Sequence, residues 1–292
     1  MEVKTIAVIG AGTMGRGIAY ASAVGGYFTV LEDISQAMLE QGLNWIRNAL
    51  DEGVAREKVD AATRDLTLRN LKTANKVQDA IRDAELIIEA VPEEMEMKLE
   101  LFTIFDKFAK PNAIFGSNTS SLSITDMSDV TVCRDRCIGM HFFNPVPKMK
   151  LLELVMTPFT SEETLATCRE VGRRMNKEVV VVKDSPGFVT SRVSAIISNE
   201  AFALLESGVA SAEDIDKALK LGLNHPMGPL ELADLVGLDV YLHVLEYLCE
   251  TLGEKYRPNA LLQKYVREGR LGRKSGRGVF EYAPHGSHGD KP

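Results

Sequence analysis

The first half of the chain alternates short apolar runs with stretches of helical periodicity. Continuous β-branched runs suit buried parallel strands, and the stretches between them have the spacing and end signals of helices. We predict strands at residues 5–9, 28–31, 86–88, 113–115, 137–143, 151–156 and 179–182. We predict helices at 15–24, from an N-cap at Ser35 to about Leu50, and at 93–110, before Pro111. This alternation predicts an α/β fold with a Rossmann-type, doubly wound sheet.

The pattern changes after the Lys-Asp-Ser-Pro-Gly segment at 183–187. No further β-rich run follows, and apolar residues at 197, 201, 204 and 205 have the spacing of an amphipathic helix. We therefore predict a Rossmann-type domain over residues 1–183 and an all-α C-terminal domain over 184–292. The polar tail from His285 to Pro292 is expected to be frayed.

Composition narrows the class of protein. Apolar residues make up 45% and charged residues 26% of the 292, which excludes a disordered chain and a disulfide-stapled miniprotein. The formal net charge of −7 disfavours a general nucleic-acid partner. No run reaches the ~18 apolar residues that span a bilayer, so we expect no membrane association. The first strand run begins at Val3, which leaves no room for a cleaved leader.

The cysteines are expected to be inert thiols in a reducing compartment. They form no CxxC pair and do not lie with histidines at zinc spacing, so no metal site is predicted. The cytoplasm is the default location. They stand at positions Cys133, Cys137, Cys168 and Cys249.

A glycine-rich motif lies between the first strand and the first helix. Its six residues, Gly10, Ala11, Gly12, Thr13, Met14 and Gly15, read G-x-G-x-x-G. In this context Gly10 allows a tight turn, Gly12 lets the backbone approach a pyrophosphate, and Gly15 allows close helix–strand packing. The free N–H groups at the helix start then bind the anion. The alternative is a tight strand–helix turn without a ligand.

An acidic residue follows this motif at the expected distance. Asp33 ends the second strand, where a carboxylate can accept hydrogen bonds from ribose hydroxyls. A 2′-phosphate there would meet the like charges of Glu32 and Asp33, so NAD is favoured over NADP. The alternative for Asp33 is a charge that stabilises the start of a helix.

Three polar side chains near the ends of later strands are candidates for chemistry. Ser120 follows a strand in a polar loop, and the turn at 144–147 separates the strands that contain His141 and Glu153. If these two strands pair as a hairpin, the histidine and the glutamate can meet. A histidine oriented by a carboxylate is a general base with a fixed tautomer. The alternative is a structural His–Glu pair.

Longer motifs resemble a known family. The segments VIGAGTMGRGIA, SNTSSLSIT, GMHFFNPVPKMKLLELV, DSPGFV and LGLNHPMGPLELADLVGLD together resemble the L-3-hydroxyacyl-CoA dehydrogenases, most of all the bacterial 3-hydroxybutyryl-CoA dehydrogenases. The resemblance runs from about Lys4 to Tyr282. It implies NAD-linked interconversion of a 3-hydroxyacyl-CoA and a 3-ketoacyl-CoA.

The resemblance also implies roles for single residues. His141 would be the general base, Glu153 would orient it, Ser120 would hydrogen-bond the reacting oxygen, and Asn144 would lie near the nicotinamide and the substrate carbonyl. Three further positions match residues that contact the cofactor in this family. For the two lysines among them, the alternative is a solvated surface charge. These positions are Glu93, Lys98 and Lys274.

One position departs from the family's pattern. The motif usually reads PGF-x-x-N-R with an asparagine that contacts substrate, and Ser191 takes that place here. A serine is shorter and offers one hydroxyl in place of an amide, which puts substrate preference in doubt. For the coenzyme A moiety, Arg56 is the basic residue best placed after the second strand.

Two other functions stay open at this point. A related hydroxyacid dehydrogenase, such as a sugar-acid 3-dehydrogenase, would act on free acids without coenzyme A. A non-catalytic NAD-binding protein is the second alternative. Apolar helical faces in the second half exceed what one layer needs, so we expect a homodimer through that domain.

Overall fold

A computed structural model describes residues 1–282 of the chain. The chain divides into two compact units, one from Met1 to Asp184 and a second that begins at Ser185. The boundary predicted after residue 183 lies one residue before this division. The tail at 285–292, for which fraying is predicted, lies outside the described residues.

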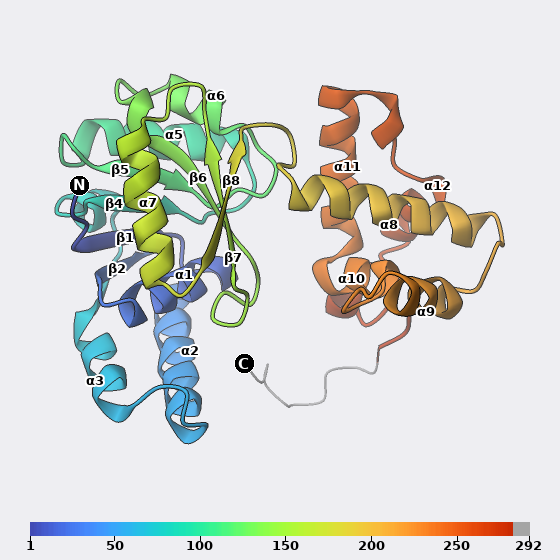
Figure 1. The fold of residues 1–292 in the computed structure, drawn as a ribbon, viewed down its shortest axis with the longest axis horizontal. Coiled ribbons are helices and arrows are strands. Elements are labelled where there is room, and N and C mark those ends of the chain that lie inside the picture. Colours follow the sequence, from blue (N-terminus) through green and yellow to red (C-terminus); the bar gives the residue numbers. More distant parts are fainter. Residues whose placement is uncertain (283–292) are drawn as a thin grey trace. The chain divides into compact units, whose positions relative to one another are not determined.

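The first unit contains an eight-stranded sheet in the order β3-β2-β1-β4-β5-β6-β7-β8 (Figure 1). Neighbouring strands are parallel except for β6 and β7, which are antiparallel. The strands are β1 Thr5–Ile9, β2 Phe28–Glu32, β3 Leu71–Ala74, β4 Leu86–Glu89, β5 Ile114–Ser117, β6 Cys137–Phe142, β7 Leu151–Met156 and β8 Glu178–Lys183.

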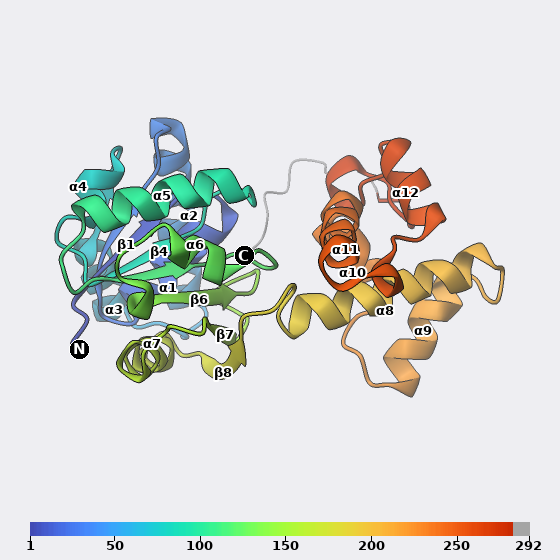
Figure 2. The ribbon, with the colours of Figure 1, turned by 90° about the horizontal axis from the view of Figure 1, so that it is seen from above.

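Helices cover both faces of this sheet, as a doubly wound fold requires. Figure 2 shows α5 and α7 on opposite faces. Serine or aspartate side chains cap four of these helices: Ser35 for α2, Asp60 for α3, Ser123 for α6 and Ser161 for α7. The helices are α1 Thr13–Val24, α2 Gln36–Ala55, α3 Ala61–Asn70, α4 Val77–Ile81, α5 Met95–Phe108, α6 Ile124–Asp129 and α7 Glu162–Arg174.

The sequence-based prediction is right on the class and wrong on several details. The edge strand β3 and the helices α3, α4, α6 and α7 are not among the predicted elements. Helix α2 continues beyond Leu50 to Ala55, and α5 begins at Met95 instead of Glu93. The predicted strand at 137–143 ends one residue earlier, at Phe142. None of these differences moves a strand that we expected to carry a candidate side chain.

The second unit is helical, as predicted, and has its own apolar core. Its described residues contain isolated β-bridges but no strand. Two buried carboxylates in this unit accept hydrogen bonds from backbone N–H groups of segments distant in the sequence. Asp216 accepts hydrogen bonds from the first N–H groups of α10, and Asp234 accepts them from the Val279 and Phe280 backbone. The helices are α8 Thr190–Glu206, α9 Ala212–Gly222, α10 Pro229–Val236, α11 Leu238–Leu252 and α12 Ala260–Arg267.

Across residues 1–282, every helix is too short or too polar to cross a lipid bilayer.

Candidate active site

The glycine turn that joins β1 to α1 leaves room for a phosphate. Gly10 has a φ of +99°, and a Cβ there would lie 2.7 Å from the Ala90 carbonyl oxygen. A Cβ on Gly15 would lie 1.7 Å from the Gly10 carbonyl oxygen, so this position also requires glycine. Around Gly12, by contrast, no other heavy atom lies within 4 Å of an added Cβ. A side chain would clash at Gly10 and at Gly15, whereas the space beside Gly12 is open. A dinucleotide pyrophosphate needs such an open approach to the backbone.

Asp33 is held directly beside this turn. Its Oδ2 accepts a hydrogen bond from the Ala11 N–H at 2.9 Å, and its Oδ1 accepts one from the Ser35 N–H at 2.8 Å. Each carboxylate oxygen can accept more than one hydrogen bond, so Asp33 keeps capacity for ribose hydroxyls. The carboxylate is therefore fixed between the glycine turn and the start of α2.

Glu32, the last residue of β2, has a raised pKa. Glu32 is buried, and burial followed by the charge of Asp33 raises the pKa of Glu32 to about 7. Its Oε1 is buried without a hydrogen-bond partner in the described part of the chain. Glu32 is therefore partly protonated near neutral pH, which reduces its own repulsion of a 2′-phosphate.

Three charged side chains, Glu89, Glu93 and Lys98, form ion pairs at and after the carboxyl end of β4. Lys98, on α5, is 1% exposed, and its Nζ lies 2.7 Å from Glu89 Oε1 and 3.3 Å from Glu93 Oε2. The expectation that Lys98 could be a solvated surface lysine is wrong, because two carboxylates compensate its buried charge. Sequence reasoning missed Glu89. Its one signal is an acid that ends the apolar run of β4.

Glu93 links these ion pairs to the loop after β5. Its Oε1 accepts hydrogen bonds from the Thr119 hydroxyl at 2.6 Å and from the Ser120 N–H and hydroxyl at 2.9 and 3.2 Å. Burial acts to raise the pKa of Glu93, but the charge of Lys98 and these hydrogen bonds outweigh it and lower the pKa. A fully charged Glu93 thus fixes the position of the Ser120 side chain.

His141 and Glu153 face each other across β6 and β7. The antiparallel register pairs the two residues directly, as the hairpin prediction requires. His141 Nδ1 and Glu153 Oε2 lie 2.7 Å apart, within hydrogen-bond distance, and both side chains are buried. A carboxylate only accepts, so Nδ1 carries the proton and the basic lone pair lies on Nε2. The histidine ring also packs against Phe143 in a tilted arrangement, with 4.3 Å between ring centroids and 46° between the ring planes.

These side chains gather at one edge of the sheet. Strands β1, β2, β4, β5 and β6 are parallel, so their carboxyl ends meet at the same edge. The Phe142 N–H donates to Asn118 Oδ1 at 3.0 Å, which ties the end of β6 to the loop that contains Ser120. This edge is where ligands bind in open α/β sheets.

Matches to two family models identify the family. The family model for the 3-hydroxyacyl-CoA dehydrogenase NAD binding domain matches residues 5–185, and the model for the C-terminal domain of the same enzymes matches residues 187–282. The chain belongs to the 3-hydroxyacyl-CoA dehydrogenase family. Its cofactor is therefore NAD, and its class is that of the oxidoreductases.

Relatives of this dehydrogenase match over nearly the whole chain. A probable 3-hydroxybutyryl-CoA dehydrogenase of Bacillus subtilis is 43% identical over 283 residues, covering 97% of this chain and 98% of the relative. The human mitochondrial hydroxyacyl-coenzyme A dehydrogenase is 39% identical over 288 residues, covering 96% and 91%. The crystal structure of (S)-3-hydroxybutyryl-CoA dehydrogenase from Ralstonia eutropha has a TM-score of 0.93 and 43% identity, covering 97% of this chain and 100% of that chain.

Four further candidate residues lie on other elements of the two units. Asn144 is exposed in the connection between β6 and β7. Arg56, at the end of α2, is largely exposed and pairs with Glu52 at 3.2 Å. In the second unit of the dehydrogenase, Ser191 lies in the first turn of α8, and Lys274 forms a half-exposed ion pair with an aspartate of α11 at 2.7 Å. The structure is thus compatible with the interpretation of Lys274 as a solvated surface charge.

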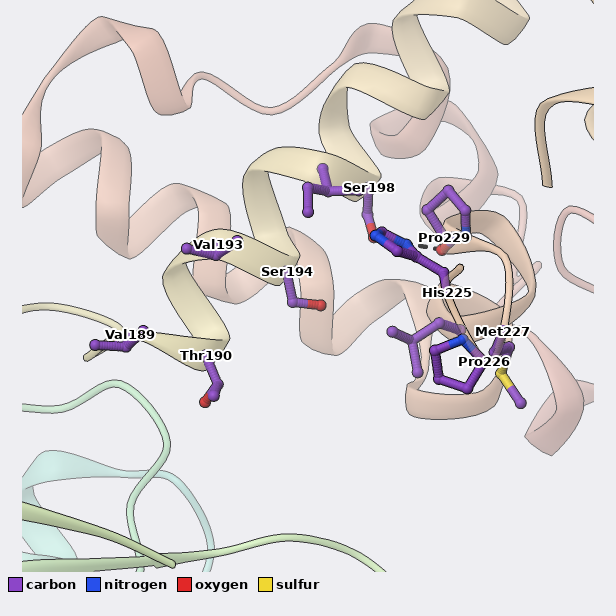
Figure 3. Close-up of a pocket in the computed structure, with 11 residues that line it drawn as sticks. Val189, Thr190, Val193, Ser194, Ser198, His225, Pro226, Met227 and Pro229 are labelled. Carbon is purple, nitrogen blue, oxygen red and sulfur yellow. Dashed lines mark hydrogen bonds between the residues drawn. The ribbon is translucent and has the colours of Figure 1, made fainter. Parts of the chain in front are cut away.

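The second unit also has a pocket of about 390 Å³ (Figure 3). Figure 3 shows α8 on one side and the segment before α10 on the other, with the hydroxyls of Thr190 and Ser194 among mostly apolar side chains. Ser191 is not one of its lining residues. The lining includes Val189, Val193, Ile197, Pro226, Met227 and Leu232.

Proposed function

We propose that this dehydrogenase interconverts (S)-3-hydroxyacyl-CoA and 3-ketoacyl-CoA, with short-chain 3-hydroxybutyryl-CoA as the preferred substrate. The observation that carries the proposal is the buried His141–Glu153 pair, 2.7 Å apart, at the sheet edge that also carries the glycine turn. The names of the bacterial relatives at about 43% identity support the short-chain preference.

In the proposed reaction His141 is the general base. Nε2 accepts the proton of the 3-hydroxyl group while the C3–H bond breaks and the carbonyl forms. When bound, NAD supplies the acceptor for the hydride that leaves C3. The histidine becomes a cation in this step, and the buried carboxylate of Glu153 stabilises that cation through Nδ1. In the reverse direction the same imidazolium returns the proton to the oxygen.

Ser120 is proposed to hydrogen-bond the reacting oxygen. A serine hydroxyl has one proton, which in this structure points to Glu93 Oε1. To donate to the substrate, the hydroxyl turns away from Glu93, whose Oε1 still accepts from Thr119 and the Ser120 N–H. The backbone of Ser120 therefore stays fixed while its side chain changes partner.

The cofactor and the substrate would use residues from several segments. Asp33 would bind the adenosine ribose, and the glycine turn would bind the pyrophosphate. Arg56 would contact the coenzyme A moiety, and Ser191, together with Ser120 and Asn144, would contact the acyl part. The further proposed NAD contacts are Ala11, Thr13, Met14, Glu93, Lys98, Ser120, Asn144 and Lys274.

We also propose a homodimer through the second unit and a cytoplasmic location. Val209, Leu221 and Leu223, within and beside α9, are 69%, 77% and 67% exposed, and their burial against a second copy would stabilise a dimer. Light scattering at micromolar concentration tests the dimer. A monomer there would refute it. The location rests on the four cysteines, all of which are free thiols.

One assay tests the proposed substrate. NADH oxidation is followed with acetoacetyl-CoA, with free acetoacetate and with 3-ketoacyl-CoA esters from C4 to C16. The proposal predicts the highest specificity constant for the C4 thioester. Equal turnover of the free acid would favour a sugar-acid type dehydrogenase, and the absence of any turnover would favour a non-catalytic NAD-binding protein.

A further inference from the structure

The connection between β6 and β7, residues 143–150, follows the strand that contains His141. The N–H groups of Lys148 and Met149 both donate to the Pro145 carbonyl, at 2.9 and 3.0 Å, and close the segment into a turn. These hydrogen bonds are internal to the connection. They shape the turn but do not fix where it lies relative to the rest of the site. Asn144 lies in this turn.

A buried lysine from a distant segment fixes the turn. Lys177 precedes β8, and its side chain is buried. Its Nζ donates to the carbonyl oxygens of Val146 and Met149, the second at 2.7 Å. Burial lowers the pKa of this amine. An ammonium group that is buried and bonded to neutral carbonyls costs desolvation energy, so its hydrogen bonds to the turn must compensate.

Helix α1 also packs against this turn. Val146 is 1% exposed, and a Cβ added to Gly17 would lie 2.9 Å from its Cβ and Cγ2 atoms. Helix α1 is the helix that begins at the glycine turn. The turn is therefore held both by packing against α1 and by hydrogen bonds from the Lys177 amine.

We propose that Lys177 is a positioning residue for the reaction, acting through Asn144. The inference rests on the proposed function, in which Asn144 lies near the nicotinamide and the substrate carbonyl. Without the amine, two carbonyls of the turn lose their donor, and the turn can regain hydrogen bonds only by moving toward water. Asn144 moves with it, while the glycine turn and Asp33 keep their own hydrogen bonds.

The test compares Lys177→Met with Lys183→Met, the same change at an exposed position of β8. With acetoacetyl-CoA and NADH, Lys177→Met is expected to lower kcat by about tenfold or more, because small displacements of reacting groups are costly. The Kd for NADH should stay within about threefold, and Lys183→Met should keep the wild-type kcat. An unchanged kcat in Lys177→Met would overturn the inference.

A double mutant separates positioning from a general structural role. If Lys177 acts through Asn144, adding Lys177→Met to Asn144→Ala lowers kcat no further than the worse single change. Losses that multiply would overturn the inference, as would an Asn144→Ala variant with wild-type kcat.

Gly17→Ala provides a second perturbation of the same turn if Lys177→Met does not fold. It keeps Lys177, suits a helix, and pushes Val146 from the side of α1. We expect the same loss of kcat and the same lack of additivity with Asn144→Ala, and a wild-type kcat would count against the inference. A wild-type chain without turnover would overturn the proposed function itself, whereas an active wild type with active turn variants overturns this inference alone.

Discussion

Oε1 of Glu93 accepts hydrogen bonds from both the backbone N–H and the hydroxyl of Ser120, at 2.9 and 3.2 Å. One carboxylate oxygen thus holds the serine at two atoms, and Lys98 holds the other oxygen of that carboxylate at 3.3 Å. The position of the proposed oxygen-binding hydroxyl depends on the ion pairs that join Glu93 to Glu89 through Lys98.

Glu93→Gln should disturb Ser120 while leaving the chain folded. The amide keeps one acceptor but removes the charge opposite Lys98, so we expect kcat to fall about tenfold. Glu94→Gln, at the exposed neighbouring position, serves as the control and should change kcat little. Steady-state reduction of acetoacetyl-CoA measures both. Equal values for the two variants would show that the contact to Ser120 does not matter.

Glu153→Gln should separate orientation of His141 from stabilisation of its cation. The amide oxygen can still accept from Nδ1, but the negative charge is lost, and we expect kcat to fall about 100-fold. Glu178→Gln, on the exposed start of β8, is the matched control. A kcat within about twofold of wild type would leave the pair as a structural contact.

Asp33→Ala should weaken NAD binding and reduce the discrimination against NADP. The change removes the carboxylate that Ala11 and Ser35 orient, and hydrogen bonds to charged groups are worth about 1.5–3 kcal/mol. We expect the KM for NAD to rise about 10- to 100-fold. Specificity constants with both cofactors provide the measurement. An unchanged ratio of the two would contradict the role of Asp33.

The raised pKa of Glu32 makes stability depend on pH. Its pKa rises from the ordinary 4.5 to about 7 on folding, so between these values the native state holds a proton that the unfolded chain has lost. Rising pH therefore destabilises the native state across this window. Glu32→Gln removes the dependence, and its gain in Tm over wild type should widen from pH 5 to pH 8. Thermal unfolding at several pH values tests this, with the exposed Glu100→Gln as control. A constant difference would be the contrary result.

Most of the architecture follows from apolar periodicity, because buried parallel strands leave an unmistakable pattern. The strand β3 does not, since Leu71–Ala74 is a short edge strand whose two central residues are exposed. Helix α3 is missed for a similar reason, because Thr67 is its one buried residue and gives no apolar face.

The geometry of the candidate site is likewise only partly predictable from the sequence. The pairing of His141 with Glu153 is readable from a turn midway between two strand runs, because antiparallel register then opposes them. The burial of Lys98 cannot be predicted from the sequence, because it depends on the positions of two carboxylates, Glu89 and Glu93, in the folded chain. The raised pKa of Glu32 likewise depends on burial, which its position in the sequence does not reveal.

The most direct test of the account is the turnover of His141→Gln with acetoacetyl-CoA and NADH, measured beside the Kd for NADH. The account predicts that kcat falls by about 1000-fold while the Kd for NADH stays near that of wild type. A kcat close to wild type would show that another group moves the proton. A loss of NADH binding would instead show that His141 maintains the structure of the site.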